Sequence, residues 1–233
     1  MKKIIWLFLA AVIMLCSCGG PSKADQYRQQ KHEQDSISLA EQEKSLEYYN
    51  SQIEALMPTL DSLLALFQYD KQEKYQDKGY YGSRNQQSNR NTQRNYLQTL
   101  VRDDGRPEIR AYAYGERKSN WKTVTLSAED IEVVFDGNVH SFEAEGWHQI
   151  LTIEDGAMEA LQFVDAHAND KIRVAYQHQK GNFAAYILPE QDKQIMLQAY
   201  QLSIVVSDIR ELEKRIKKTS LEVEKYQKRL QKY

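Results

Sequence analysis

Cysteine is nearly absent from this chain of 233 residues: Cys16 and Cys18 are its only two, both near the start. The body of the protein therefore has no disulfide framework and no thiolate metal site. A basic excess is also missing, because 31 Lys and Arg oppose 33 Asp and Glu and the net charge is −2. That balance argues against an electrostatic nucleic-acid binder. With 41% hydrophobic and 27% charged residues, the composition is that of a folded, soluble protein.

Signatures of the common enzyme classes are missing as well. The chain contains no GxSxG, HExxH, Walker or GxGxxG sequence, which are local patterns of catalytic and nucleotide-binding sites. The five histidines stand at no metal-ligand spacing: His32, His140, His148, His167 and His178. We therefore predict no catalytic residue, no metal and no cofactor. The open alternative is a hydrolase of cell-wall or glycan material with turn carboxylates, such as Asp104, Asp136 or Glu154, as acid and base.

The first residues are typical of a bacterial secretory signal. Lys2 and Lys3 precede an unbroken apolar run from Ile4 to Leu15. A run of about a dozen residues is too short to span a bilayer comfortably and fits a signal peptide, to which we assign residues 1–17. An ordinary secretory signal with incidental cysteines is the alternative.

The run ends in Leu15-Cys16-Ser17-Cys18-Gly19, which resembles the lipobox of bacterial lipoproteins: an aliphatic residue, small residues, then the cysteine that receives lipid. Cys18 is the predicted acceptor of the acyl chains, palmitate among them, because Cys16 would leave Leu15 where a small residue is expected. In lipoproteins that this stretch resembles, an aspartate after the lipidated cysteine favours retention in the inner membrane. Gly19 therefore suggests the outer membrane, at its periplasmic face or its surface.

Heptad repeats at both ends organise the rest of the chain. In the last quarter, apolar residues recur at alternating spacings of three and four: Leu202, Val205, Ile209, Leu212, Ile216, Thr219, Val223, Tyr226, Leu230 and Tyr233. The N-terminal part repeats the alternation: Leu39, Gln42, Leu46, Tyr49, Ile53, Leu56, Leu60, Leu63 and Phe67. Such a helix has one narrow apolar seam and needs a partner. We predict two paired terminal helices, with a kink or a break at Pro58.

Charge favours pairing within one chain. Residues 24–57 carry seven acids and three bases (−4), whereas residues 210–233 carry nine bases and four acids (+5). Opposite charges favour this partner over self-pairing of either arm, so we predict a monomeric antiparallel hairpin, with a homodimeric coiled coil as the rival. Aligning the seams places three pairs opposite each other, with a shift of one heptad left open: Leu63 and Ile209, Leu56 and Ile216, Leu46 and Tyr226.

Between the arms the pattern changes to short strands and turns. Eight strands are predicted: Tyr96–Arg102, Glu108–Tyr114, Lys122–Leu126, Ile131–Phe135, Val139–Phe142, Trp147–Ile153, Lys171–Gln177 and Asn182–Leu188. Hairpin turns are expected at 103–106, 136–138 and 179–181, and a helix capped by Asp155 over 157–168. The predicted fold class is α+β: a long antiparallel two-helix coiled coil formed by the terminal arms, carrying a small antiparallel β-rich domain with one helix.

These patterns divide the chain into six segments. They are a signal peptide (1–17), the lipidated cysteine with a polar tether and helix start (18–36), an N-terminal coiled-coil arm (37–77), a polar loop (78–94), the β-rich domain (95–188) and a C-terminal arm (189–233). Six aromatic residues form the predicted binding surface: Tyr80, Tyr81, Tyr112, Tyr114, Trp121 and Trp147. The alternative is that these rings fill the core of the small sheet. The hairpin tips near Gly105, Gly137 and Gly181 are further exposed places for contact.

The whole arrangement resembles lipoproteins of Bacteroidetes-type bacteria with terminal coiled-coil helices, a group to which no activity is attached. Three stretches besides the lipobox prompt this resemblance: Lys78-Gly79-Tyr80-Tyr81, Arg94-Asn95-Tyr96-Leu97 and Ile187-Leu188-Pro189-Glu190-Gln191-Asp192-Lys193. It implies an envelope location and transfers no catalytic residue. We therefore expect a membrane-anchored, non-enzymatic spacer or binding module whose partner is an envelope protein or a glycan.

Overall fold

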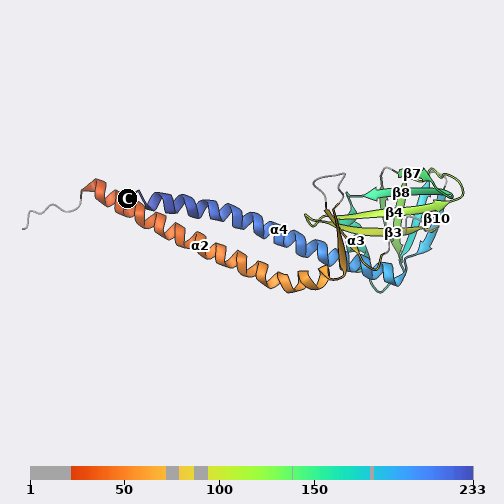
Figure 1. The fold of residues 1–233 in the computed structure, drawn as a ribbon, viewed down its shortest axis with the longest axis horizontal. Coiled ribbons are helices and arrows are strands. Elements are labelled where there is room, and N and C mark those ends of the chain that lie inside the picture. The colour runs from red at the N-terminus through yellow and green to blue at the C-terminus, as the bar shows by residue number, and fades with distance from the viewer. Residues whose placement is uncertain (1–21, 72–78, 87–93, 138, 179–180, 233) are drawn as a thin grey trace, which may run out of the picture. The chain divides into compact units, whose positions relative to one another are not determined.

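The computed structural model describes residues 22–71, 79–86, 94–137, 139–178 and 181–232 (Figure 1). The predicted signal peptide and Cys18 lie outside these ranges. Within them, no helix combines the length and apolar character needed to cross a membrane. The chain forms two compact units, residues 1–50 with 214–233 and residues 51–213. Two long helices, α2 (Lys23–Leu64) and α4 (Glu190–Leu230), contribute to both units.

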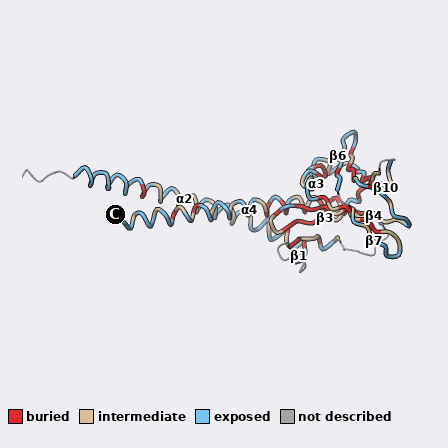
Figure 2. The backbone as a smooth tube through the Cα atoms, turned by 90° about the horizontal axis from the view of Figure 1, so that it is seen from above, coloured by how far each residue is buried: buried red, intermediate tan, exposed pale blue. Residues whose placement is uncertain are grey.

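The first unit contains the terminal parts of α2 and α4, which pack together as predicted. The seam positions are the shielded ones: Thr219 and Val223 are 9% and 8% exposed, and their seam neighbours Ile216 and Tyr226 are half-buried. Most residues between seam positions face solvent (Figure 2). The heptad pattern is thereby confirmed, because only one narrow stripe of each helix is withdrawn from water.

An ion pair fixes the register of the two helices. Asp35 is 6% exposed, and its Oδ1 lies 3.6 Å from a guanidinium nitrogen of Arg229. In the register expected above, matched residue numbers add to 272, which would place Arg229 opposite Glu43 rather than near Asp35. The numbers of Asp35 and Arg229 add to 264. The observed register is therefore the one shifted by a heptad, in which matched numbers add to 265.

The second unit supports the shifted register independently. In the register that adds to 265, three leucines of α2 meet three apolar residues of α4: Leu56 and Ile209, Leu60 and Val205, Leu63 and Leu202. All six belong to one hydrophobic cluster with Phe67 and Val101. Of the partners expected for Leu63 and Leu56 in the unshifted alignment, Ile209 belongs to the cluster and Ile216 does not. The seam alone could not choose between registers, because a heptad pattern repeats itself every seven residues.

The register predicts a selective disulfide. In the chain from residue 18 onward with Cys18→Ser, which has no cysteine, Leu46→Cys with Thr219→Cys should form an intramolecular disulfide on mild oxidation. The matched control, Leu46→Cys with Tyr226→Cys, should not, because seven residues of helix displace the second cysteine by about 10 Å. Non-reducing electrophoresis and peptide mass spectrometry separate the products. Cross-linked dimers in place of the intramolecular bond would contradict the hairpin.

The N-terminal arm ends earlier than expected. Helix α2 passes through Pro58 as one helix and stops at Leu64, so the prediction of an arm to residue 77 is wrong. Strands β1 (Phe67–Lys71) and β2 (Gly79–Ser83) follow and pair antiparallel, and β2 lies inside the segment expected to be a polar loop. Phe67 continues the heptad spacing but is a buried strand residue, 2% exposed. Short strands with polar neighbours lack the alternation that would have identified them.

Ten strands of the second unit form two antiparallel sheets. The six-stranded sheet has the order β1-β2-β3-β4-β8-β7 and adds β3 (Tyr96–Arg102), β4 (Pro107–Gly115), β7 (Val139–Glu143) and β8 (Trp147–Ile153). The four-stranded sheet has the order β10-β9-β5-β6, with β5 (Thr123–Ala128), β6 (Ile131–Asp136), β9 (Arg173–His178) and β10 (Gly181–Ile187). All eight predicted strands are present with ends within two residues of the expected ones. The α+β fold class is confirmed.

Two local predictions for this domain are wrong. The turn at 136–138 does not close a hairpin, because β6 pairs with β5 and β7 pairs with β8, in different sheets. The β5–β6 hairpin turns instead at Glu129, whose φ of 51° is left-handed without a glycine to signal it. Helix α3 (Ala157–Ala166) begins at Gly156, whose φ of 90° sets the turn, and no side chain caps it, so Asp155 is not the cap.

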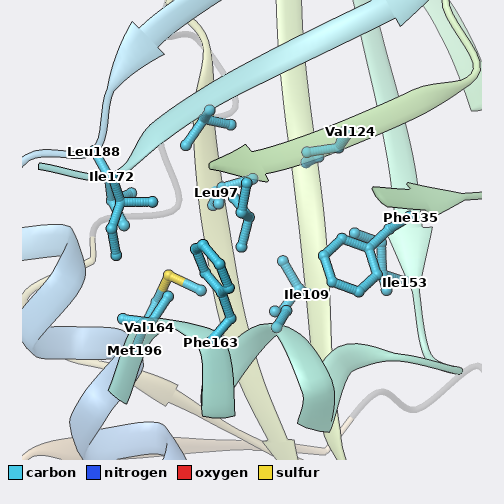
Figure 3. Close-up of a cluster of buried hydrophobic side chains, with 14 of the residues drawn as sticks. Leu97, Ile109, Val124, Phe135, Ile153, Phe163, Val164, Ile172, Leu188 and Met196 are labelled. Carbon is cyan, nitrogen blue, oxygen red and sulfur yellow. The ribbon is translucent and has the colours of Figure 1, made fainter. Parts of the chain in front are cut away.

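The main core lies between the two sheets and is closed by α3. Figure 3 shows side chains from both sheets converging, with Phe163 of α3 directed toward Leu97 and Ile109. Met196 from the start of α4 joins the same cluster. Tyr176 of β9 ties the sheets together, because its hydroxyl lies 2.9 Å from the carbonyl oxygen of Tyr112 and 3.2 Å from that of Tyr96. This hydroxyl gives backbone carbonyl groups of the opposite sheet a hydrogen-bond donor.

Candidate binding site

A cavity of about 870 Å³ opens where the two sheets meet beside the edge strand β7. Its wall comes from the segment between β4 and β5, the turn before β7, strands β7 and β8, and the end of β9. The lining residues are Lys118, Ser119, Asn120, Trp121, Lys122, Gly137, Val139, Ser141, Gln149 and His178. Pockets of roughly 300–1,000 Å³ are the usual size for small ligands. We take this cavity as the candidate binding site.

A buried glutamine holds the cavity wall in place. Gln149 of β8 is 3% exposed. Its amide nitrogen donates to the carbonyl oxygen of Ser119 at 2.6 Å, and its amide oxygen accepts from the backbone N–H of Ser119 at 2.9 Å. The same nitrogen lies 3.3 Å from the hydroxyl of Ser141 on β7. One side chain thus fastens the irregular 118–122 segment to the sheet, which orders the site before any ligand arrives.

The cavity lining is positively charged. Lys118 and Lys122 are both exposed, His178 lies at the end of β9, and none of the described lining residues is an Asp or a Glu. In the described ranges neither lysine has an ion-pair partner. The Lys118 ammonium lies 5.6 Å from the centre of the Trp147 ring, within reach of a cation–π contact. Both ammonium groups are therefore exposed at the cavity without a carboxylate at ion-pair distance among the described residues, so they can attract an anion.

The six predicted aromatic residues do not form one surface. Trp121 is 1% exposed and packs edge-on against Tyr176 at 4.9 Å, so it belongs to the core and only backs the cavity. Trp147 is half-buried, and its ring lies beside Lys118, which lines the cavity. Of the predicted set, Trp121 alone is among the described residues that line the cavity.

The four predicted tyrosines lie elsewhere on the six-stranded sheet. Tyr112 and Tyr114 share one face of β4, as expected from their spacing, and Tyr112 stacks on Tyr96 with ring centres 4.4 Å apart. Tyr80 is 9% exposed beneath the guanidinium of Arg110. Tyr81 packs against the second hydrophobic cluster. Of the hairpin tips, that at Gly105 is buried against α4 rather than exposed.

Sequence reasoning missed the polar part of the cavity. Lys118, Asn120, Ser141 and Gln149 carry no motif, and they come from three separate segments: residues 118–122, β7 and β8. A lysine on each side of a Trp-containing irregular stretch was the one available signal.

The carboxylates of the hydrolase alternative are engaged in structural contacts. Burial tends to raise the pKa of Asp104, but its hydrogen bonds with Arg106 outweigh this and hold the pKa below the usual range. Glu154 lies 3.3 Å from Arg102, which also faces Asp104. Asp136 ends β6, opposite Thr123. A general acid needs a raised pKa, and none of the three carboxylates lines the cavity, so the geometry does not favour that mechanism.

Metal-ligand geometry is likewise not found in the described ranges. No group of three or more His, Cys, Asp or Glu side chains there could hold an ion. His148 stacks on Phe142 with ring centres 5.0 Å apart, and His167 lies 2.8 Å from a carboxylate oxygen of Asp170. These contacts account for both rings as parts of the structure.

Because several tyrosines are buried, we predict that the domain loses folding stability at alkaline pH. Burial raises the pKa of Tyr80 and Tyr81 and places that of Tyr176 well above its ordinary value of 10.0. The unfolded chain therefore loses these protons first, so stability is complete below about pH 10 and falls at higher pH, by up to about 1.4 kcal/mol per pH unit for each buried group. Urea midpoints between pH 8 and 11 should show the fall. Tyr176→Phe should flatten it, whereas Tyr27→Phe, at a ring 64% exposed, should not.

Comparison with known proteins gives no relative: no protein-family model, no curated protein and no solved structure matches the chain. The site must therefore be judged on its own geometry.

Proposed function

We propose that this protein is a lipid-anchored, non-enzymatic binding protein of the bacterial cell envelope. Its paired terminal helices act as a spacer, and its β-rich domain binds a glycan in the cavity between the two sheets. The cavity carries the proposal, because it combines a preorganised wall with hydroxyl, amide and cationic side chains and has no carboxylate among its described lining residues.

The paired helices support the spacer part of the proposal. Helices α2 and α4 contain 42 and 41 residues. At a rise of 1.5 Å per residue, a helix of that length measures about 60 Å. In the first unit the shielded positions of both helices are confined to one stripe, which faces the partner helix.

A glycan is favoured over a protein partner by the shape and chemistry of the cavity. Asn120, Ser119 and Ser141 offer hydrogen-bond donors and acceptors of the kind that pair with sugar hydroxyls. The ring of Trp121 adds an aromatic element to the same wall. Protein interfaces, in contrast, are usually extended surfaces rather than a single cavity.

Blocking the cavity tests this proposal. Envelope polysaccharide fractions should be retained by the immobilised lipid-free chain, residue 18 onward with Cys18→Ser. Asn120→Trp should abolish retention, because an indole at an exposed lining position fills the mouth without disturbing the core. Asn169→Trp is the matched control, since Asn169 is exposed near the opposite end of β9. Equal retention by both variants, or none by the parent chain, would contradict the proposal.

The membrane anchor has its own prediction. Cells expressing the full chain and fed a clickable fatty acid should label it, and Cys18→Ala should lose the label and leave the membrane fraction, whereas Cys16→Ala should keep both. A single acyl chain binds membranes only marginally, so stable attachment requires the several chains of a lipoprotein. Label that persists in Cys18→Ala would overturn the assignment.

A further inference from the structure

The charge of the cavity lining restricts the ligand further than its shape does. Lys118 and Lys122 stand four residues apart on one irregular segment, with Asn120 between them. A neutral sugar would leave these charges without a partner, whereas an anionic ligand would pair with them.

Within the described ranges no carboxylate lies at ion-pair distance from either lysine. The acids nearest to them in sequence and strand register, Glu116 and Asp136, are exposed and do not line the cavity. The ammonium of Lys118 contacts a ring rather than an anion. The two ammonium groups are therefore available to a ligand, and they would steer an anion to the mouth and hold it there.

The rest of the lining indicates what carries the anionic group. Ser141 on β7 and Asn120 present hydroxyl and amide groups that can both donate and accept, as a polyhydroxylated ligand requires. Trp121 provides the aromatic part of the wall, which can contact the carbon side of a sugar ring. An acidic peptide would use the lysines but would leave this mixed polar and aromatic wall without a matching partner.

We infer that the ligand is an acidic glycan, an oligosaccharide bearing carboxylate groups that Lys118 and Lys122 bind. This inference rests on the proposed glycan-binding function and names the ligand class of the same cavity. The carboxylates bind at the ammonium groups, while the sugar hydroxyls bind the amide and hydroxyl side chains of the wall.

The test compares an acidic oligosaccharide with its neutral twin. Tetragalacturonate and its fully methyl-esterified form have the same length and ring structure, and the ester replaces each carboxylate with a neutral methyl ester. Calorimetry with the lipid-free chain should show binding of the acid, and binding of the ester weaker by about ten-fold or more. Raising the salt concentration from 50 to 500 mM should weaken binding of the acid and leave that of the ester nearly unchanged.

Paired lysine variants locate the charge effect. Lys118→Gln with Lys122→Gln should lower the affinity for tetragalacturonate to that of the ester. The matched control, Lys214→Gln with Lys217→Gln, removes the same charge from exposed positions of α4 and should change nothing. All four lysines are exposed, so both variants should unfold at the temperature of the parent chain.

Each outcome discriminates between the two proposals. Equal binding of acid and ester would overturn the acidic-glycan inference and leave glycan binding standing. Equal loss of affinity in both lysine variants would also overturn it. Binding of tetraglutamate as tight as that of tetragalacturonate would overturn the glycan and leave the anion site. Failure of both saccharides, with envelope polysaccharide still retained, would overturn this inference alone. Loss of that retention as well would overturn the proposed function.

Discussion

Replacing Trp121 with alanine should lower the free energy of unfolding by about 3–5 kcal/mol, the range for removing a buried large aromatic side chain. The ring is 1% exposed and is among the largest fully buried side chains of the described structure. It packs edge-on against Tyr176, whose hydroxyl joins the two sheets. Since small proteins are stable by only about 5–15 kcal/mol, this variant should be close to unfolded at 37 °C.

Trp121→Phe keeps an aromatic ring at this position and removes the indole N–H. The indole N–H has no hydrogen-bond partner among the described residues, so its removal forfeits no bond, and the cost should stay near 1–2 kcal/mol for the lost volume. Urea unfolding followed by far-ultraviolet circular dichroism measures both variants without relying on tryptophan fluorescence. A phenylalanine variant as unstable as the alanine variant would show that the indole N–H is engaged and that the packing argument is incomplete.

The terminal helices were predictable because their signal repeats. Eight positions of α2 and nine of α4 follow the heptad spacing, and Thr219, the one polar member of its seam, is 9% exposed. Register could not be read from that signal, since each heptad resembles the next. It is fixed by Asp35, a carboxylate that continues the seam spacing four residues before Leu39 and meets Arg229.

Strands were predictable where the chain alternates, and their pairing was not. From Ile109 to Tyr114 the residues of β4 are alternately buried and half-buried. Such alternation identifies a strand from local sequence. Whether β7 joins β6 or β8 depends on which sheet closes over the core, and the Asp136-Gly137 turn serves a crossover as well as a hairpin. The long-range choice carries no local signature.

The cavity was beyond sequence reasoning for the same reason. Its parts are the 118–122 segment, the turn and edge strand from 137 to 141, Gln149 and His178. They meet only because β5 joins one sheet and β8 the other. From sequence, aromatic residues were the natural candidates for a binding surface. Most of them instead pack within the sheets, as Tyr96 stacked on Tyr112 shows.

The tip of the β3–β4 hairpin is docked on helix α4, and Gly105 is the residue that permits it. Its φ is +87°, and an added Cβ would lie 2.7 Å from the backbone nitrogen of Ser207 and 3.0 Å from its Cα. The hydroxyl of Ser203 donates to the carbonyl oxygen of Gly105, and the guanidinium Nε of Arg210 donates to that of Asp103 at 3.2 Å. A helix backbone cannot move aside without breaking its own hydrogen bonds.

Gly105→Ala should therefore cost about 2–4 kcal/mol, because it adds a backbone clash to the left-handed strain. Gly181→Ala is the control: its φ is +125°, but an added Cβ would meet nothing within 4 Å, so only the strain of roughly 1–2 kcal/mol should remain. Urea unfolding gives both values, and hydrogen exchange in the Gly105→Ala chain should show faster opening of α4 around Ser203 and Ser207. Equal costs for the two substitutions would mean that the hairpin tip and the helix are not held together.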